Sequence, residues 1–217
     1  MTFAFCTDPL DYVRGDERPW AIASLRRYFG GFTGAHFEHL ADKDNPDRFT
    51  ERDLVAVTML AVDVPPRTAW SILRGPEADE LSALLAGVPK AVDALWSDGE
   101  ALSAESPAWT LHRRLIGMTG LGRTTVTKLL AAKRPHLVPI FDSVVGEALR
   151  IGWNDDDWAA WRSALSDESA REDVAAVRDE LPDAADLSLL RTLDIAIWMR
   201  HKGWVQAGDN PIPPFGK

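Results

Sequence analysis

The stretch Gly117–Val145 reads GMTGLGRTTVTKLLAAKRPHLVPIFDSVV and combines a glycine turn, a basic segment and a single aspartate. Gly120 and Gly122 permit backbone angles denied to other residues and leave room for a ligand close to the backbone. Leu121, between them, is expected to drop between two flanking helices and hold the turn. The amide groups that start the second helix then point outward, where the helix dipole favours an anion. The stretch therefore predicts a helical hairpin that binds a phosphate group.

The second helix of this hairpin is expected to have one apolar and one polar face. Its apolar residues Val126, Leu129 and Leu130 are expected to face inward. Its polar residues are expected to face outward and flank the anion with cations: Arg123, Thr124, Thr127 and Lys128. The predicted phosphate-binding residues are Gly120, Leu121, Gly122, Arg123, Thr124 and Lys128. A Gly-x-Gly turn is common, so the motif gains specificity only from its surroundings.

The charge of the chain is unevenly spread. The formal net charge is −9, which argues against indiscriminate nucleic-acid binding. The window Leu111–Arg150 nevertheless carries +5, with seven Lys and Arg side chains against Asp142 and Glu147. A local basic patch on an acidic body can bind an anion. Alternatively, these side chains are only the solvated faces of two helices.

The rest of the chain predicts an all-α fold, because no segment alternates with the period-2 pattern of a strand. Thr50 and Asp53 form a weak capping box before an apolar run that is expected to be a central buried helix. Ser106 and Pro107 mark another helix start. The predicted helices are 50–62, 66–75, 76–87, 89–99, 106–118, 154–166, 168–181 and 186–203.

The predicted organisation is one helical domain over residues 1–217. It has an irregular N-terminal segment (1–48), a helical core (50–150) that contains the hairpin (106–134), C-terminal helices (151–203) and an extended tail (204–217). A stripe of aromatic residues at helical spacing is expected to lie in the core rather than to bind a ligand: Trp153, Trp158 and Trp161, with Leu165. The tail has three prolines, which favour an extended conformation.

Several other classes of site are excluded by the sequence. The longest uncharged apolar run, Leu54–Val62, is far shorter than the roughly 20 residues of a membrane span, and the chain is expected to be cytoplasmic. A single cysteine, Cys6, rules out an internal disulfide, a multi-cysteine zinc site and a four-cysteine cluster. Asp42–Asp47 lacks the glycine of a calcium loop, and Pro46 occupies a ligand position. No metal and no cofactor are expected.

Two histidines of the N-terminal segment have the spacing of paired metal ligands. His36 and His39 lie three residues apart and could share one helix face. No third ligand accompanies them, and the His-Glu-x-x-His pattern of zinc enzymes is absent. They are expected to be a surface pair.

The hairpin and the segment after it resemble the helix-hairpin-helix DNA glycosylases. The turn MTGLG, followed by RPHLVPIFD ending at Asp142, matches that family's hairpin and its proline-flanked aspartate. Upstream, DLVAVTMLAVDVPPRTAWSILR is similar to its early helices, so the resemblance covers Leu54–Arg150. The phrase RPHLVPI-x-D also resembles a group of uncharacterised bacterial proteins. The resemblance implies a DNA partner and an all-α glycosylase-like fold.

The resemblance also implies a role for Asp142, whose carboxylate would stabilise positive charge on a sugar as an extruded base departs. Bifunctional members carry a lysine where this chain has Thr124. Without that amine no Schiff base can form, so the chain is expected to excise a base without cleaving the strand by this route. Two further departures are Thr119 in place of the usual proline, and MLAVDV where many members have a Ser-Gln motif.

Alternatives remain open for the aspartate and for the whole chain. Asp142 precedes a predicted helix, and capping a helix start is among the commonest uses of aspartate. Both roles are compatible, because a capping carboxylate stays ionised. The chain is therefore expected to be a DNA-binding protein and a possible monofunctional DNA glycosylase. The alternative is an inactive or repurposed helical module that binds a protein or another ligand, and the oligomeric state stays open.

Overall fold

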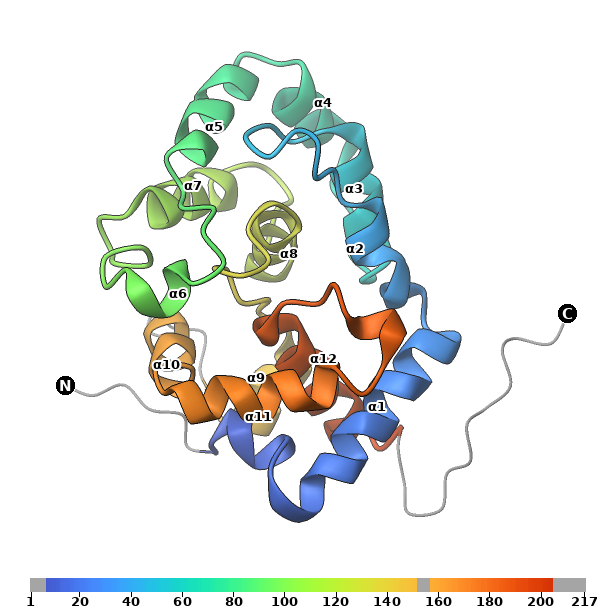
Figure 1. Ribbon diagram of the computed structural model, residues 1–217. Helices are drawn as coiled ribbons and strands as arrows, with labels where there is room; N and C mark the ends of the chain where they lie inside the picture. Colours follow the sequence, from blue (N-terminus) through green and yellow to red (C-terminus); the bar gives the residue numbers. More distant parts are fainter. Residues whose placement is uncertain (1–6, 152–156, 205–217) are drawn as a thin grey trace, which may run out of the picture. The chain divides into compact units, whose positions relative to one another are not determined.

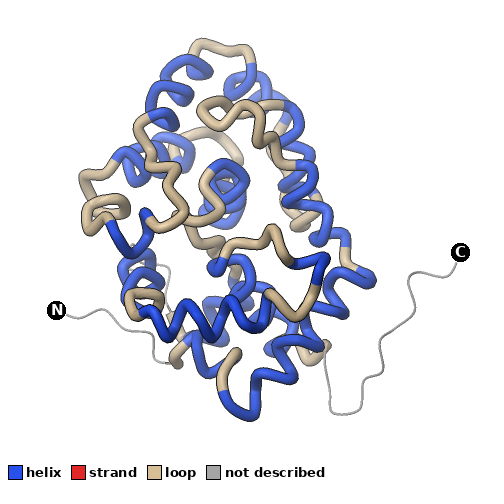
Figure 2. Tube along the Cα trace, viewed as in Figure 1, coloured by secondary structure: helices blue, strands red, loops and turns tan. Residues whose placement is uncertain are grey.

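The computed structural model describes residues 7–151 and 157–204, and within these ranges it contains helices and loops but no strand (Figure 2). The all-α prediction is confirmed. The α-helices are α1 (Arg18–Gly31), α2 (Phe37–Leu40), α3 (Glu51–Thr58), α4 (Pro66–Leu73), α5 (Glu77–Ala86), α6 (Ala94–Ser97), α7 (Pro107–Ile116), α8 (Arg123–Lys133), α9 (Ser143–Leu149), α10 (Asp157–Ala164), α11 (Glu168–Arg178) and α12 (Leu189–His201). Short 3₁₀ helices are η1 (Pro9–Tyr12), η2 (Gly15–Glu17), η3 (Thr33–His36) and η4 (Pro182–Ala184).

The chain divides into two compact units, which are described separately. The first unit combines residues 1–35 with 142–217, and the second is the continuous segment His36–Phe141. The predicted hairpin belongs to the second unit, and Asp142 is the first residue of the returning segment of the first unit. The single domain predicted from the sequence stays a prediction.

Helix α12 forms the centre of the first unit and packs against α1, α9, α11 and η1 (Figure 1). Its start is capped by Ser188, whose hydroxyl oxygen accepts a hydrogen bond from the Arg191 amide at 3.1 Å. The predicted aromatic core is confirmed for Trp158, Trp161 and Leu165, which are all buried. Trp153, the tail after Trp204 and Cys6 lie outside the described residues.

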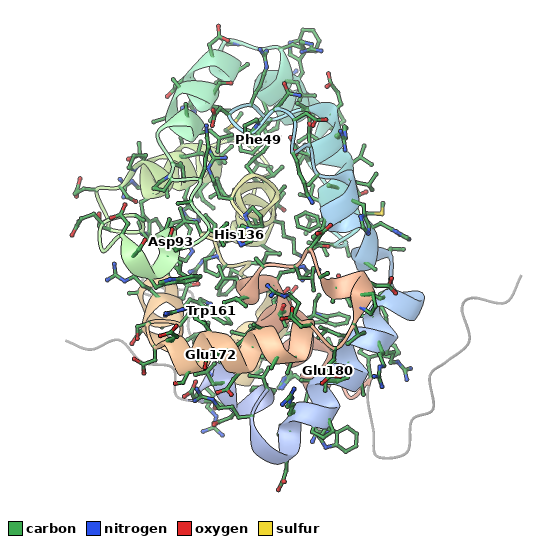
Figure 3. The ribbon with its side chains drawn as sticks, in the orientation of Figure 1. Phe49, Asp93, His136, Trp161, Glu172 and Glu180 are labelled. Atoms are coloured by element: carbon green, nitrogen blue, oxygen red, sulfur yellow. The ribbon has the colours of Figure 1, made fainter. Side chains whose placement is uncertain are left out.

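Helix α8 forms the centre of the second unit. It packs against α3 and α7, while α5 packs against α4 and α7. Figure 1 shows α8 nearly end-on among these helices. Phe49, which is buried, lies in the space that they enclose (Figure 3). This central position exposes little of α8, and every residue from Thr125 to Lys133 is buried.

Three regions differ from the sequence prediction. The N-terminal segment over residues 1–48, expected to be irregular with short helices joined by loops, contains the 14-residue helix α1, which is longer than expected. The helix predicted over 50–62 begins as expected but ends at Thr58, and Val55 on it is 49% exposed, so α3 is not buried on all sides. The helix predicted over 89–99 is reduced to the four residues of α6.

The second unit is held together by a charge buried at the end of α8. The Lys133 ammonium lies 2.6 Å from the Asp53 carboxylate, and both side chains have no exposed surface. The same ammonium donates to the carbonyl oxygens of Asp42 and Asn45 at 2.9 and 3.0 Å. The Asp53 carboxylate in turn accepts from the Thr50 amide at 2.8 Å, which is the aspartate half of the predicted capping box. One ion pair thus joins α8, α3 and the loop before α3.

Arg134 adds a second anchor beside the first. Its guanidinium donates to the carbonyl oxygens of Val88, Pro46 and Leu85 and to the Asp47 carboxylate. Burial lowers the pKa of Arg134 from its usual value, and the hydrogen bond with Asp47 opposes that shift. A hydrogen bond from Lys90 is the main cause that lowers the pKa of the Asp47 carboxyl. The loop rejected as a calcium site is therefore folded around two cationic side chains.

We predict that Asp53→Ala destabilises the protein by about 3–5 kcal/mol, because it leaves the Lys133 ammonium buried without its counter-charge. The exposed pair of Arg74 and Glu51, at 2.9 Å, provides a matched control. Arg74→Ala should cost less than about 1 kcal/mol. Chemical denaturation measures both free energies of unfolding. Equal, small losses for the two variants would show that the buried pair is dispensable.

Candidate nucleic-acid interface

The predicted hairpin is formed by α7, the turn Gly117–Gly122 and α8. Helix α7 begins at the predicted cap, where the Ser106 hydroxyl oxygen accepts from the Trp109 amide at 3.2 Å. Gly120 has a φ of +79°, in the left-handed region that favours glycine. A Cβ atom at this position would lie 2.5 Å from Cγ of Pro65. The turn therefore requires glycine for its backbone angle and for its close approach to the start of α4.

Leu121 occupies the place predicted for it. Its side chain is 6% exposed, and its amide donates to the carbonyl oxygen of Met118 at 3.2 Å. Burial of a leucine side chain contributes about 1.5–3 kcal/mol, which is enough to hold a short turn in one conformation. The turn is a fixed element of the second unit.

The start of α8 is not capped by a side chain. Its N-cap residue is Gly122, which is exposed, and a Cβ atom added there would meet nothing within 4 Å. The first hydrogen bond of the helix runs from the Val126 amide to the Gly122 carbonyl at 3.0 Å. The amides of Thr124 and Thr125 precede it and point along the helix axis toward this open position. An anion could approach them without meeting a side chain of Gly122.

Arg123 lies at this helix start in a defined position. Its guanidinium is 4.1 Å from the centre of the Phe141 ring, and the residue is partly exposed. Stacking on an aromatic ring restricts the conformations of the arginine side chain, and the planar guanidinium stays charged. Phe141 is itself fixed, because its amide donates to the Thr127 hydroxyl oxygen at 2.9 Å. Arg123 thus begins α8 and packs its guanidinium on the Phe141 ring.

Two outward-facing residues of the prediction are wrong. Thr127 is fully buried and bonded to Phe141. Lys128 is also buried, and its ammonium donates to the Leu60 carbonyl oxygen at 2.8 Å. The physical reason is that the segment after α3 reaches Lys128 and the segment that ends at Phe141 covers Thr127, so the expected polar face lies inside the unit. Contact between Lys128 and a phosphate stays a prediction.

The basic window consists mostly of cations engaged within the protein. Lys133 and Arg134 form the buried anchors, and Arg114 lies 3.0 Å from the Glu80 carboxylate. Arg113 donates to the carbonyl oxygen of Ala104 at 2.9 Å. The net charge of +5 counted along the sequence therefore overstates the positive charge available to a ligand. The alternative of solvated helix faces is also wrong for the two buried anchors.

Helix α4 lies beside the hairpin, which sequence reasoning did not anticipate. The Thr68 hydroxyl donates to the Thr119 carbonyl oxygen at 2.6 Å, and Pro65 touches the Gly120 backbone as described above. These two contacts tie the first turn of α4 to the turn of the hairpin. In the sequence, Pro65 and Pro66 mark only the start of a helix. Gly120, against which Pro65 lies, is 55 residues away, and no local pattern predicts that contact.

Asp142 is the N-cap of α9. Its Oδ1 atom accepts from the Val144 amide at 2.9 Å, and its side chain is partly exposed. The capping interpretation is confirmed by this bond. The catalytic interpretation stays a prediction. Asp142 follows Phe141 directly in the chain, so it comes next after the last residue of the hairpin's unit.

We predict that Asp142→Ala lowers the free energy of unfolding by about 1 kcal/mol, whereas Asp142→Asn leaves it nearly unchanged. Alanine removes the acceptor for the Val144 amide, and asparagine keeps one. Thermal or chemical denaturation of both variants measures the difference. A loss for asparagine as large as that for alanine would mean that the charge, rather than the cap, stabilises this helix.

Metal and membrane sites find no support in the described ranges. No group of three or more potential metal ligands occurs among residues 7–151 and 157–204. His36 and His39 are both exposed, in accordance with a surface pair. Nor does any helix in these ranges have both the length and the apolar character needed to cross a membrane.

Comparison with protein families finds a match over most of the chain. Residues 21–201 match a family of unknown function (DUF6308), which accords with the predicted resemblance to uncharacterised proteins. No curated protein and no solved structure matches the chain. The match spans most of the first unit's described helices and the whole second unit.

Proposed function

The chain belongs to this family of unknown function, and we propose that it binds DNA through the hairpin of α7 and α8. The single observation that carries the proposal is the open start of α8, which Gly122 leaves without a capping side chain. Backbone amides at a helix start, assisted by the helix dipole, bind phosphate groups. The buried Leu121 and the constrained Gly120 fix these amides before a ligand arrives. The resemblance of MTGLG to glycosylase hairpins supports DNA as the source of the phosphate.

The engaged cations define what kind of binding is expected. Since Lys128, Lys133 and Arg134 are buried and the Arg123 guanidinium stacks on Phe141, the backbone amides supply most of the attraction at this site. Few phosphates are then neutralised, and each contributes about 0.9 to the slope of log affinity against log salt. We therefore propose weak DNA binding with a slope of about one to two.

We predict that Gly122→Asp weakens DNA binding about tenfold or more while the protein stays folded. A Cβ atom at this position meets nothing within 4 Å, and aspartate caps a helix at least as well as glycine. Its carboxylate would accept hydrogen bonds from the amides at the start of α8, which would then no longer be open to a phosphate. Its negative charge would also repel the DNA. Fluorescence anisotropy with a labelled duplex at low salt measures the affinity.

The matched control is Gly30→Asp, which adds the same charge at another glycine with open space around it. It lies outside the hairpin and leaves the α8 amides open, so it should change the affinity less than about twofold if these amides bind the phosphate. Equal losses for the two variants would attribute binding to net charge alone. An affinity that does not change with salt, or no binding by the wild-type chain, would favour the alternative of a protein- or ligand-binding module.

Base excision is the second half of the proposal, and it rests on Asp142. Glycosidic cleavage commonly uses a carboxylate to stabilise positive charge on the sugar. The cap bond to the Val144 amide holds Oδ1 in place. Thr124 offers no amine, so no covalent Schiff base can form at that position. The proposed reaction is hydrolysis of the base–sugar bond that leaves the strand intact.

We predict that Asp142→Asn abolishes excision, with a rate loss of about 10²-fold or more, while DNA affinity and stability change little. A screen over damaged and mismatched bases first identifies a substrate, and single-turnover rates then compare the two proteins. Wild-type rates in the variant would remove Asp142 from the mechanism. Trapping of an enzyme–DNA adduct with borohydride would contradict the strand-preserving reaction, and a blank screen would contradict excision itself.

A further inference from the structure

The segment that follows α8 returns to the helix that it leaves. It begins at Arg134, the C-cap of α8, and residues 137–141 are all buried. Its last residue, Phe141, donates from its backbone amide to the Thr127 hydroxyl oxygin of α8 at 2.9 Å. The segment therefore runs from the end of α8 back toward its start, and it is held at both ends.

Phe141 is held by two residues of α8 that lie about one turn apart. The Arg123 guanidinium packs on its ring, with the guanidinium carbon 4.1 Å from the ring centre. The Thr127 hydroxyl holds its backbone through the hydrogen bond described above. Residues four positions apart share a helix face, so both contacts come from one face of α8. A ring contact and a backbone contact together fix the position of Phe141.

The Thr127 hydroxyl connects Phe141 to the first turn of α8. It donates to the Thr124 carbonyl oxygen at 3.3 Å while it accepts from the Phe141 amide. The first turn also contains the amides of Thr124 and Thr125, which belong to the proposed phosphate site. Thr127 itself has no exposed surface, so it cannot contact DNA directly. Any influence of Thr127 on a bound ligand must pass through the residues that its hydroxyl holds.

Asp142 follows Phe141 by one peptide bond, so their Cα atoms are about 3.8 Å apart. The backbone that enters Asp142 is therefore fixed by the contacts of Phe141 with α8. On its other side, the Asp142 carboxylate accepts from the Val144 amide at 2.9 Å. The first of these constraints starts from the same helix turn as the proposed phosphate site.

We propose that Thr127 is a positioning residue for base excision, whose hydroxyl keeps the backbone of Asp142 in a fixed place relative to the phosphate bound at the start of α8. This inference rests on the proposed function. Catalysis by a carboxylate depends on such placement, because a displacement of about 1 Å can cost about 10²-fold in rate. Thr127 would thus act on the rate of the reaction through Phe141, and not on the affinity for DNA.

The test removes the hydroxyl while it keeps the shape of the side chain. Thr127→Val lacks the acceptor for the Phe141 amide, whereas Thr127→Ser retains it. With folded, full-length protein in excess over a substrate found by the screen described above, Thr127→Val should lower the single-turnover rate about tenfold to 10²-fold. The affinity for DNA should stay nearly unchanged, and Thr127→Ser should keep most of the rate. Thr127→Ala, which also lacks the hydroxyl and favours helix, should show the same loss as valine.

The matched control is Thr192→Val. Thr192 also has no exposed surface, and its hydroxyl donates to the Ser188 carbonyl oxygen at 3.0 Å, a bond at the start of α12. This variant should lose stability but keep the wild-type rate. Hydrogen exchange of the Phe141 amide reports the proposed contact directly. Exchange should become faster in Thr127→Val and stay unchanged in Thr127→Ser and Thr192→Val.

The outcomes separate this inference from the proposed function. If Asp142→Asn abolishes excision but Thr127→Val keeps the wild-type rate, the reaction stands and the positioning role is wrong. Equal rate losses in Thr127→Val and Thr192→Val would reduce the effect to lost stability. A loss of affinity in place of rate would assign Thr127 to the phosphate site, and either result overturns the inference. Absence of excision by the wild-type chain would contradict both ideas.

Discussion

The buried ion pair of Lys133 and Asp53 is the constraint on which the hairpin's unit depends. An unpaired ammonium in such a place would cost several kcal/mol, so the fold must bring the last turn of α8, the first turn of α3 and the loop before α3 together. Once α8 is fixed at its end, its start is fixed as well, because a helix is rigid over 11 residues. The uncapped helix start at Gly122, where we propose that a phosphate binds, is thus held by an interaction at the opposite end of the same helix. The buried Lys133–Asp53 pair thus helps to position the exposed start of α8.

The same constraint explains why counting charges along the chain misjudged the surface. The sequence correctly counts the Lys and Arg side chains of the basic window. It does not identify the acids and carbonyl groups, distant in sequence, that these side chains bind in the folded protein. Lys133 finds Asp53, and Arg134 finds Asp47, across 80 to 90 residues of sequence. Lys128 is used by the carbonyl of Leu60. The acids that neutralise two of these side chains belong to the segment rejected as a calcium loop and to the start of α3.

Local signals were predicted well, and tertiary ones were not. The caps at Ser106 and Asp142, the permissive glycine at 120 and the buried Leu121 all follow from short-range chemistry, and the structure contains each of them. The contact between α4 and the hairpin, the burial of Thr127 and the full length of α1 depend on residues distant in sequence or on weak amphipathic patterns. The local backbone of the candidate site could therefore be predicted from the sequence, whereas the residues that pack against it could not.

The division of the chain into a continuous unit and an interrupted one has a consequence for folding. Residues 36–141 can form both anchors as soon as they leave the ribosome, because both members of each anchor lie within that segment. Helix α1 must wait, since its main partner α12 is made last. Closing that contact brings together segments separated by the whole second unit, and long loops close slowly. During synthesis, α1 would carry its buried face uncovered for the longest time, and this makes it the segment most exposed to misassociation and to chaperones.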